Sequence, residues 1–240
     1  MTWPEVIIYI FFPVAGYLLG AVPFAWVIGK AHGVDIRTTG SKNIGATNLG
    51  RTLGAKYFWQ AFSLDALKGF LPVLICSLFS RKLSLPSWAP LLTAAACFLG
   101  HVFPIYLKFK GGKGVATSFG VVLGFWPLYT IAGLLGGAFF VFMLLVYRYI
   151  SLASITAAAV FAALVVMLSF RSPPYVNTAV SPGDRVALIA VAGFFALVII
   201  FRHRANIARL MKGTEPKIGQ REIEKAKLKP QNPPPPPDGR

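Results

Sequence analysis

Three lysines and three glycines are interleaved over seven residues near the middle of the chain, from Lys108 to Gly114. Glycine lets a backbone approach a ligand closely and leaves its N–H groups uncovered. The apolar residues from Val115 onward predict a helix whose free N–H groups and positive dipole end face this turn. Phosphate is the anion that the combination favours, and the candidate ligands are Lys110, Gly111, Gly112, Lys113, Gly114 and Thr117.

Two other interpretations of this turn were compared with the anion site. The order of residues is not that of a Walker A loop, which requires Gly-x-x-x-x-Gly-Lys-Ser/Thr. The lysines alone would also fix the orientation of a loop at a membrane. Orientation does not need three glycines, so the sequence favours the anion site and leaves the simpler alternative open.

A second polar stretch runs from Thr39 to Arg51 and contains three glycines. Ser41, Asn43 and Asn48 offer short hydrogen-bonding side chains, and Arg51 offers a two-pronged donor for phosphate or carboxylate. The stretch lies in a polar segment of roughly 26 residues between apolar runs, and long connections in compact folds are usually functional. A plain connecting loop remains the alternative.

A third polar stretch follows the last apolar run, from Arg202 to Gly219. His203 and Asn206 are three residues apart and share one face of a helix. An unperturbed histidine can move protons near neutral pH, although an interfacial histidine without chemistry fits the sequence equally well. Gly213 is expected to end the helix, and Glu215 is expected to act as an ion-pair partner rather than as a base.

Four further polar residues lie inside or at the edge of apolar runs. Asp65 and Lys68 are three apart on one predicted helix and can neutralise each other, in a structural pair or in contact with a substrate. His101 precedes the glycine turn and is expected to bind substrate or to hydrogen-bond between helices. Ser151 begins an apolar run, where it could cap the helix or offer its hydroxyl to a second phosphate.

The elements that must position these residues are transmembrane helices. The chain has 240 residues, is 55% hydrophobic and has a mean hydropathy of +0.63, which is typical of a polytopic all-α membrane protein. A spanning helix needs about 20 apolar residues. The apolar runs cover 6–29, 57–79, 87–107, 115–147, 151–170 and 186–201, and the longest contains Gly124-Phe-Trp-Pro127 as a break. Splitting it into 115–126 and 127–147 predicts seven helices.

The distribution of positive charge supports the count of seven. Seven spans place 19 of the 24 Lys and Arg residues on one side and four on the other, with Lys68 inside a span. Six spans would divide them ten against thirteen. The positive-inside rule therefore predicts the N-terminus outside and the C-terminus in the cytoplasm. The net charge of +16 then indicates cytoplasmic loops, anionic lipid and anionic substrates rather than nucleic acid.

The remaining composition sets the domain organisation. Residues 1–219 form one predicted membrane domain, and residues 220–240 form a basic, proline-rich tail expected to be disordered. The first apolar run has no Lys or Arg before it, so it is predicted to be a retained span and not a signal peptide. Cys76 and Cys97 lie in apolar runs and predict neither a disulfide nor a metal site. No metal and no cofactor is expected.

Together, the three polar stretches resemble the motifs of one bacterial family. They are Gly40-Ser-Lys-Asn-Ile-Gly-Ala-Thr-Asn48 with Arg51, Gly100-His-Val-Phe-Pro104 with Phe109-Lys-Gly-Gly-Lys-Gly-Val-Ala-Thr117, and His203-Arg-Ala-Asn206 with Gly213-Thr-Glu-Pro-Lys217. The family is the integral-membrane glycerol-3-phosphate acyltransferases that use acyl-phosphate as donor. Leu64-Asp-Ala-Leu-Lys-Gly69 and Tyr149-Ile-Ser-Leu-Ala-Ser154 are similar to it as well. The resemblance covers residues 5–219.

The resemblance implies a seven-helix enzyme of the bacterial inner membrane with its active site on the cytoplasmic face. It implies transfer of an acyl chain from acyl-phosphate to the 1-hydroxyl of glycerol 3-phosphate, giving lysophosphatidic acid and inorganic phosphate in the first acylation of phospholipid synthesis. Membrane lipid and an enzyme that produces acyl-phosphate are the implied partners. Ser41, Arg51 and Lys113 would bind phosphate, and His203 and Asn206 would lie at the reacting hydroxyl or carbonyl. Either His203 or a substrate phosphate would take the proton.

The sequence also bears on one other acyltransferase mechanism and two other protein classes. Acyltransferases with a His-x4-Asp pair are excluded, because no histidine here has aspartate five residues later. A transporter of anionic solutes shares the positive face, but its polar residues would follow a path across the whole bilayer. A membrane lipid phosphatase would need a nucleophile beside a histidine, and no such set is visible.

Overall fold

The computed structural model describes residues 2–86, 88–170 and 182–220, and every regular element among them is helical. The tail predicted for 220–240 lies outside the described residues except for Gln220. The elements are α1 Trp3–Val6, the π-helical turn η1 Ile7–Phe11, α2 Phe12–Ala21, α3 Phe24–Ala31, α4 Ala46–Leu53, α5 Ala55–Lys82, α6 Pro90–Val102, the 3₁₀ turn η2 Ile105–Leu107, α7 Val115–Gly124, α8 Leu128–Tyr147, α9 Ile150–Phe170, α10 Pro182–Arg202 and α11 Arg204–Met211.

Six of the described helical segments are long and apolar enough to cross a membrane. They are Trp3–Ala31, Ala55–Lys82, Pro90–Leu107, Leu128–Tyr147, Ile150–Phe170 and Pro182–Arg202. The predicted break near Pro127 is confirmed, because α7 ends at Gly124 and α8 begins at Leu128. Helix α7 has ten residues, so it is about 15 Å long and reaches through about half of a hydrocarbon core.

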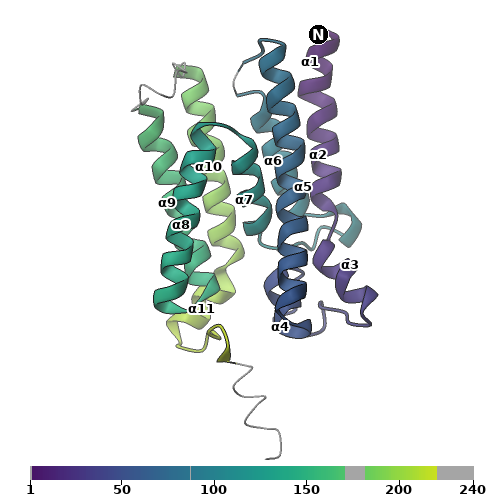
Figure 1. Ribbon diagram of the computed structural model, residues 1–240, viewed down its shortest axis with the longest axis vertical. Helices are drawn as coiled ribbons and strands as arrows, with labels where there is room; N and C mark the ends of the chain where they lie inside the picture. The colour runs from purple at the N-terminus through teal and green to yellow at the C-terminus, as the bar shows by residue number, and fades with distance from the viewer. Residues whose placement is uncertain (1, 87, 171–181, 221–240) are drawn as a thin grey trace, which may run out of the picture.

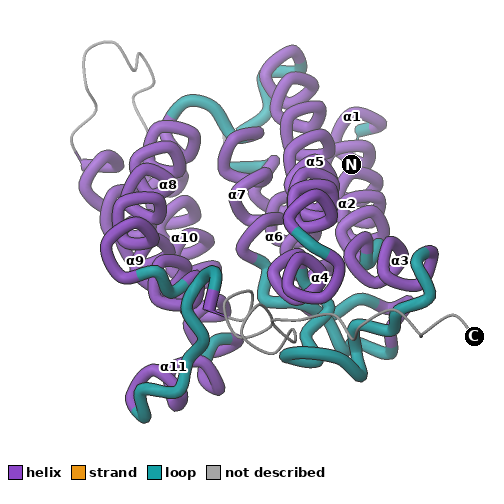
Figure 2. Tube along the Cα trace, turned by 60° about the horizontal axis from the view of Figure 1, so that its bottom comes forward, coloured by secondary structure: helices purple, strands orange, loops and turns teal. Residues whose placement is uncertain are grey.

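The helices form two groups with α7 between them (Figure 1). One group contains α1, α2, α5 and α6, and the other contains α8, α9 and α10. The start of α1 lies at one end of the bundle, and α3, α4 and α11 lie at the opposite end, which faces the viewer in Figure 2. The polar stretches found in the sequence therefore gather at the end that carries α4 and α11.

Small residues bring α7 close to α5. A Cβ at Gly120 would lie 1.8 Å from the carbonyl oxygen of Ala66, and one at Gly69 would lie 2.4 Å from that of Thr117. Such close approach of backbones is how membrane helices pack through glycine. A helix too short to span is thereby held against a long one, and this contact fixes the depth of the Lys113 turn that precedes α7.

The first span is broken where a proline follows Val22. Pro23 cannot donate the hydrogen bond that would continue the helix. The ammonium group of Lys68 lies 2.6 Å from the carbonyl oxygen of Val22 and 2.7 Å from Asp65 Oδ1. The predicted Asp65–Lys68 pair is thus present, and it ties α5 to the break between α2 and α3.

Candidate active site

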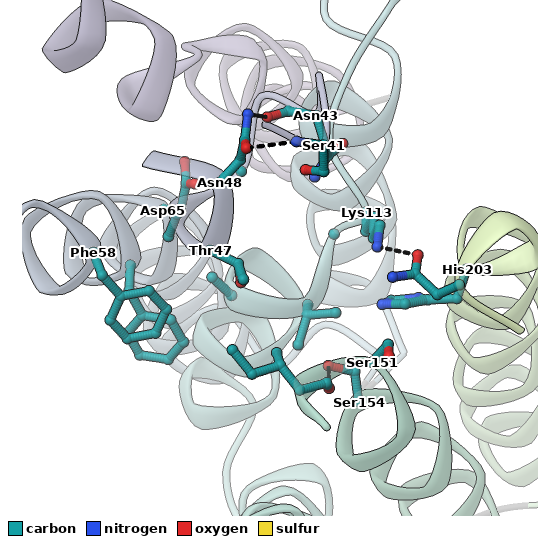
Figure 3. A pocket seen from close by; sticks show the side chains of 18 of the residues that line it. Ser41, Asn43, Thr47, Asn48, Phe58, Asp65, Lys113, Ser151, Ser154 and His203 are labelled. Carbon is teal, nitrogen blue, oxygen red and sulfur yellow. Dashed lines mark hydrogen bonds between the residues drawn. The ribbon is translucent and has the colours of Figure 1, made fainter. Parts of the chain in front are cut away.

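A pocket lies at the end of the bundle that carries α4 and α11 (Figure 3). Nine of the predicted site residues from the three polar stretches line it: Ser41, Asn43, Asn48, Arg51, Lys113, Gly114, His203, Asn206 and Glu215. Phe58 and Phe62 of α5, Phe140 of α8 and Ile150 of α9 give the pocket an apolar wall. The structure therefore brings the three stretches together around a space with one polar and one apolar side.

Three helices begin at this pocket. The lining includes Ala46 and Thr47 at the start of α4, Val115 and Ala116 at the start of α7, and Ser151 in the first turn of α9. The first N–H groups of a helix have no partner within the helix, and the helix dipole places partial positive charge there. Three such ends beside Lys113 and Arg51 make the pocket chemically suited to an anion such as phosphate.

Lys113 is connected to Glu215 through one amide side chain. Lys113 Nζ donates to Asn206 Oδ1 at 2.5 Å, and Asn206 Nδ2 donates to Glu215 Oε1 at 2.6 Å. Burial lowers the pKa of Lys113 to about 8, against the opposing effect of Glu215. Asn206 therefore positions the Lys113 ammonium group, and its side chain also lines the pocket.

Glu215 is the centre of the hydrogen bonds on the α11 side. Ser151 Oγ donates to Oε1 at 2.8 Å, and Arg209 Nε donates to Oε2 at 2.7 Å. Burial opposes ionisation of this carboxyl, but the hydrogen bonds from Asn206, Ser151 and Arg209 outweigh it and lower the pKa of Glu215. The ion-pair role expected for Glu215 is observed. Ser151 serves this carboxylate and is not the cap of α9.

His203 lies between α10 and α11, where it is 2% exposed. Its Nδ1 lies 2.8 Å from the carbonyl oxygen of Ile199. A carbonyl oxygen only accepts, so Nδ1 carries the proton and Nε2 is left as an acceptor. Burial, and next the positive charge of Lys113, lower the pKa of His203 to about 4. The imidazole in the pocket is therefore uncharged near neutral pH.

Asn48 lines the pocket and also holds the second polar stretch together. Its Nδ2 lies within 2.8 to 3.1 Å of the carbonyl oxygens of Ile36, Asn43 and Thr39, and its Oδ1 accepts from the N–H of Ser41 at 2.9 Å. The side chain folds the polar stretch onto α4 and presents Ser41 and Asn43 to the pocket. Sequence alone does not reveal that α4 lies inside this predicted loop.

The glycine turn is also used differently from the prediction. Gly111 and Gly112 pack on the end of α6, where a Cβ at Gly112 would lie 2.2 Å from His101 Nε2, and the Gly112 N–H donates to the His101 carbonyl at 3.2 Å. Lys110 is exposed, and Thr117 is fully buried on the face of α7 that packs against Gly69 of α5. Lys110, Gly111, Gly112 and Thr117 are absent from the lining, whereas Lys113 and Gly114 belong to it.

Gly114 precedes α7 with φ +84°, and a Cβ there would lie 2.3 Å from Phe98 Cε2. We expect Gly114→Ala to displace the start of α7 and to lower both the melting temperature and the turnover. Gly213 is a matched control, because its φ is +67° but nothing lies within 4 Å of its Cβ position. Gly213→Ala is expected to cost only the left-handed strain of about 1–2 kcal/mol. Equal thermal shifts in the two variants would contradict the steric explanation.

One member of the Asp65–Lys68 pair, Asp65, lies at the pocket. His101 Nδ1 lies 3.7 Å from Asp65 Oδ1, and both Asp65 and His101 contribute to the lining. Lys68 does not. Because Lys68 is committed to Asp65 and to the carbonyl of Val22, the geometry favours the supporting role for the pair.

Arg202 is a residue that sequence reasoning missed. It donates from Nε to the carbonyl oxygen of Gly112 at 3.0 Å and from Nη2 to that of Gly111 at 2.5 Å. Its position beside His203 was a usable signal, but the partners are about ninety residues away in sequence. Phe58 and Phe62, one helical turn apart, were also missed as part of the apolar wall.

Such a structure defines a helical membrane protein with a pocket for a phosphorylated substrate beside an apolar wall. A family model described as glycerol-3-phosphate acyltransferase matches residues 10–213. A glycerol-3-phosphate acyltransferase of Geotalea daltonii is 46% identical over 202 residues, covering 84% of this chain and 93% of the relative. One of Trichlorobacter lovleyi is 42% identical, covering 87% and 97%.

Solved structures agree with these relatives. PlsY (YgiH), described as an integral membrane glycerol 3-phosphate acyltransferase and crystallised in a glycerol 3-phosphate form, is 39% identical with a TM-score of 0.75. The match covers 90% of this chain and 98% of PlsY. Its lysophosphatidic acid form matches with a TM-score of 0.72. The chain belongs to the glycerol-3-phosphate acyltransferase family and is a membrane acyltransferase.

Proposed function

We propose that the enzyme transfers an acyl chain from acyl-phosphate to the 1-hydroxyl of glycerol 3-phosphate, which gives lysophosphatidic acid and inorganic phosphate. The hydroxyl oxygen forms a bond to the acyl carbonyl carbon, and the bond from that carbon to the phosphate oxygen breaks. The observation that carries this proposal is the convergence of three helix N-termini with Lys113 and Arg51 in one pocket. Two phosphate-bearing substrates repel each other, so a site that binds both needs several positively charged groups.

The main work of such a site is to hold two anions that repel each other close together and aligned. Lys113, Arg51 and Ser41 are placed to bind phosphate together with the free N–H groups of the helix ends. The acyl-phosphate bond is already an activated anhydride, so the leaving phosphate needs little help. The apolar wall of Phe58, Phe62 and Phe140 offers the acyl chain a surface away from water.

His203 is best placed to orient the attacking hydroxyl. Its Nε2 can accept the hydroxyl proton in a hydrogen bond, since Nδ1 is committed to Ile199. The phosphate leaves with an additional negative charge on the oxygen released from the acyl carbon, and that oxygen is more basic than the imidazole of His203, whose pKa is lowered to about 4. The final proton therefore resides more favourably on the departing phosphate. This difference favours His203 as the orienting acceptor and the phosphate as the base.

We also propose an orientation of the protein in the bacterial inner membrane. The start of α1 and α11 lie at opposite ends of the bundle, which agrees with an odd number of crossings. Counting α7 as the seventh crossing places the N-terminus outside and the pocket at the cytoplasmic face of the bacterial inner membrane. Residues 1–219 would form the catalytic domain, with membrane lipid and an acyl-phosphate-producing enzyme as partners.

The test is an acyl-transfer assay on purified protein in detergent, with labelled glycerol 3-phosphate and a single donor in each tube. Acyl-phosphate is expected to give labelled lysophosphatidic acid, whereas acyl-coenzyme A and acyl-carrier protein are expected to give none. Lys113→Met serves as a folded, impaired control. Product from either thioester would overturn the donor assignment. The same assay in sealed inverted vesicles tests the side, since product without detergent requires a cytoplasmic pocket.

A further inference from the structure

Arg202 joins two parts of the pocket that are distant in sequence. It is the last residue of α10, and its guanidinium group donates to the carbonyl oxygens of Gly111 and Gly112 in the turn before Lys113. Two consecutive carbonyls are thus drawn to one side chain. Only arginine has a rigid fork of donors that can hold two acceptors in this way.

The other side of the turn rests on α6. The Gly112 N–H donates to the carbonyl oxygen of His101, and both glycines lie too close to α6 for any side chain. In a planar trans peptide the C=O and N–H groups point in opposite directions. With the Gly112 carbonyl held by Arg202, the N–H of Lys113 points away from Arg202, and the direction in which the Lys113 side chain leaves the turn is fixed.

Arg202 also adjoins His203 in the chain. The end of α10 therefore sets the place of His203 directly and the place of the Lys113 backbone through two hydrogen bonds. Asn206, three residues after His203, then holds the Lys113 ammonium group at 2.5 Å. The distance between Lys113, which binds phosphate in this proposal, and His203, which faces the hydroxyl, therefore depends on residues 202–206.

We propose that Arg202 is a positioning residue for acyl transfer, which acts through the glycine turn to hold Lys113 in register with His203. Arg202 is absent from the pocket lining, so in this proposal it acts through the turn and not by touching the substrate. This inference rests on the proposed function of Lys113 as the phosphate ligand. It predicts that the contribution of Arg202 to substrate binding disappears when Lys113 is absent.

A double-mutant cycle tests the inference. The binding of glycerol 3-phosphate to the full chain in detergent is measured by titration calorimetry for wild type, Arg202→Gln, Lys113→Met and the double variant. We expect Arg202→Gln to weaken binding about tenfold in the wild-type background and hardly at all in Lys113→Met. If the double variant instead loses affinity by the product of the two single losses, Arg202 acts independently of Lys113 and the inference is overturned.

Two further variants separate positioning from general stability. Arg204→Gln makes the same change two residues later, where the side chain is exposed and lies over Phe201, and it is expected to bind like wild type. Arg202→Lys keeps the charge but not the fork and is expected to recover only part of the affinity; full recovery would show that charge alone suffices. If Arg202→Gln does not fold, the cycle is run with Arg202→Lys. No acyl donor is present, so a wrong donor assignment leaves these results unaffected.

Discussion

Lys113→Met is expected to lower kcat/KM for glycerol 3-phosphate by about 10³-fold, in the range found when a preorganised donor to a developing or bound anion is removed. Lys113 is the cation whose ammonium group is fixed within the pocket by Asn206, and α7 begins directly after its turn. The measurement is steady-state transfer with each substrate varied in turn. Lys56→Met removes an exposed lysine from the first turn of α5 and is the matched control for net charge. A loss in Lys113→Met no larger than in Lys56→Met would contradict the role of Lys113.

The protonation of Lys113 gives the same prediction a pH signature. With a pKa of about 8, Lys113 is charged below that pH and neutral above it. The groups that face it are Glu215, which favours its charged form, and Arg51, Arg202, Arg209 and His203. We therefore expect kcat/KM to fall as the pH rises through about 8. Arginine stays charged throughout, so Lys113→Arg is expected to have lower activity but no such fall. The same fall in Lys113→Arg would assign it to another group.

His203→Ala is expected to lower kcat by about 10²-fold, because the attacking hydroxyl loses the acceptor that orients it. The imidazole Nε2 is held at the pocket by the contact from Nδ1 to Ile199, and alanine removes the acceptor altogether. His203→Gln offers an amide oxygen as acceptor and is expected to recover part of the loss, as an orienting role requires. Turnover is measured with both substrates saturating.

His32 provides the control for this histidine. Its Nδ1 lies 2.9 Å from the carbonyl oxygen of Ile28, four residues earlier, as the Nδ1 of His203 does from Ile199. The His32 ring contacts the ring of Tyr57, is exposed, and does not line the pocket. His32→Ala is expected to leave turnover unchanged. Near-full turnover in His203→Ala would remove His203 from the mechanism and leave the substrate phosphate as the only proton acceptor proposed.

Local signals in the sequence predicted the local structure well. Val115 begins α7 as the glycine turn indicated, Gly213 has the left-handed conformation that follows a helix end, and Asp65 pairs with Lys68 one turn later. Each of these depends on residues within a few positions of one another. The polar stretches could also be assigned to one site, because charge and hydropathy placed them on the same side of the membrane.

The hydrogen bonds of Asn48 and Asn206 could not be predicted from the sequence, because they depend on how the chain folds. Asn48 turns inward because three carbonyls of its own loop converge on it, and Asn206 is occupied because Lys113 and Glu215 reach it from both sides. No spacing rule contains that information. The length of α7 was clear from the Gly124–Pro127 break, but the close contact of Gly120 with α5 needed the fold.

The three helix N-termini at the pocket limit how much phosphate affinity a side-chain substitution can remove. Their charge belongs to peptide groups, which every substitution except proline retains. Replacing Lys113 or Arg51 therefore removes one charged side chain but leaves the N–H groups at the helix ends. Variants that lack one of these cations are expected to keep weak, salt-sensitive affinity for both substrates. In this proposal, part of the affinity for phosphate comes from main-chain N–H groups, and no single side-chain substitution removes it.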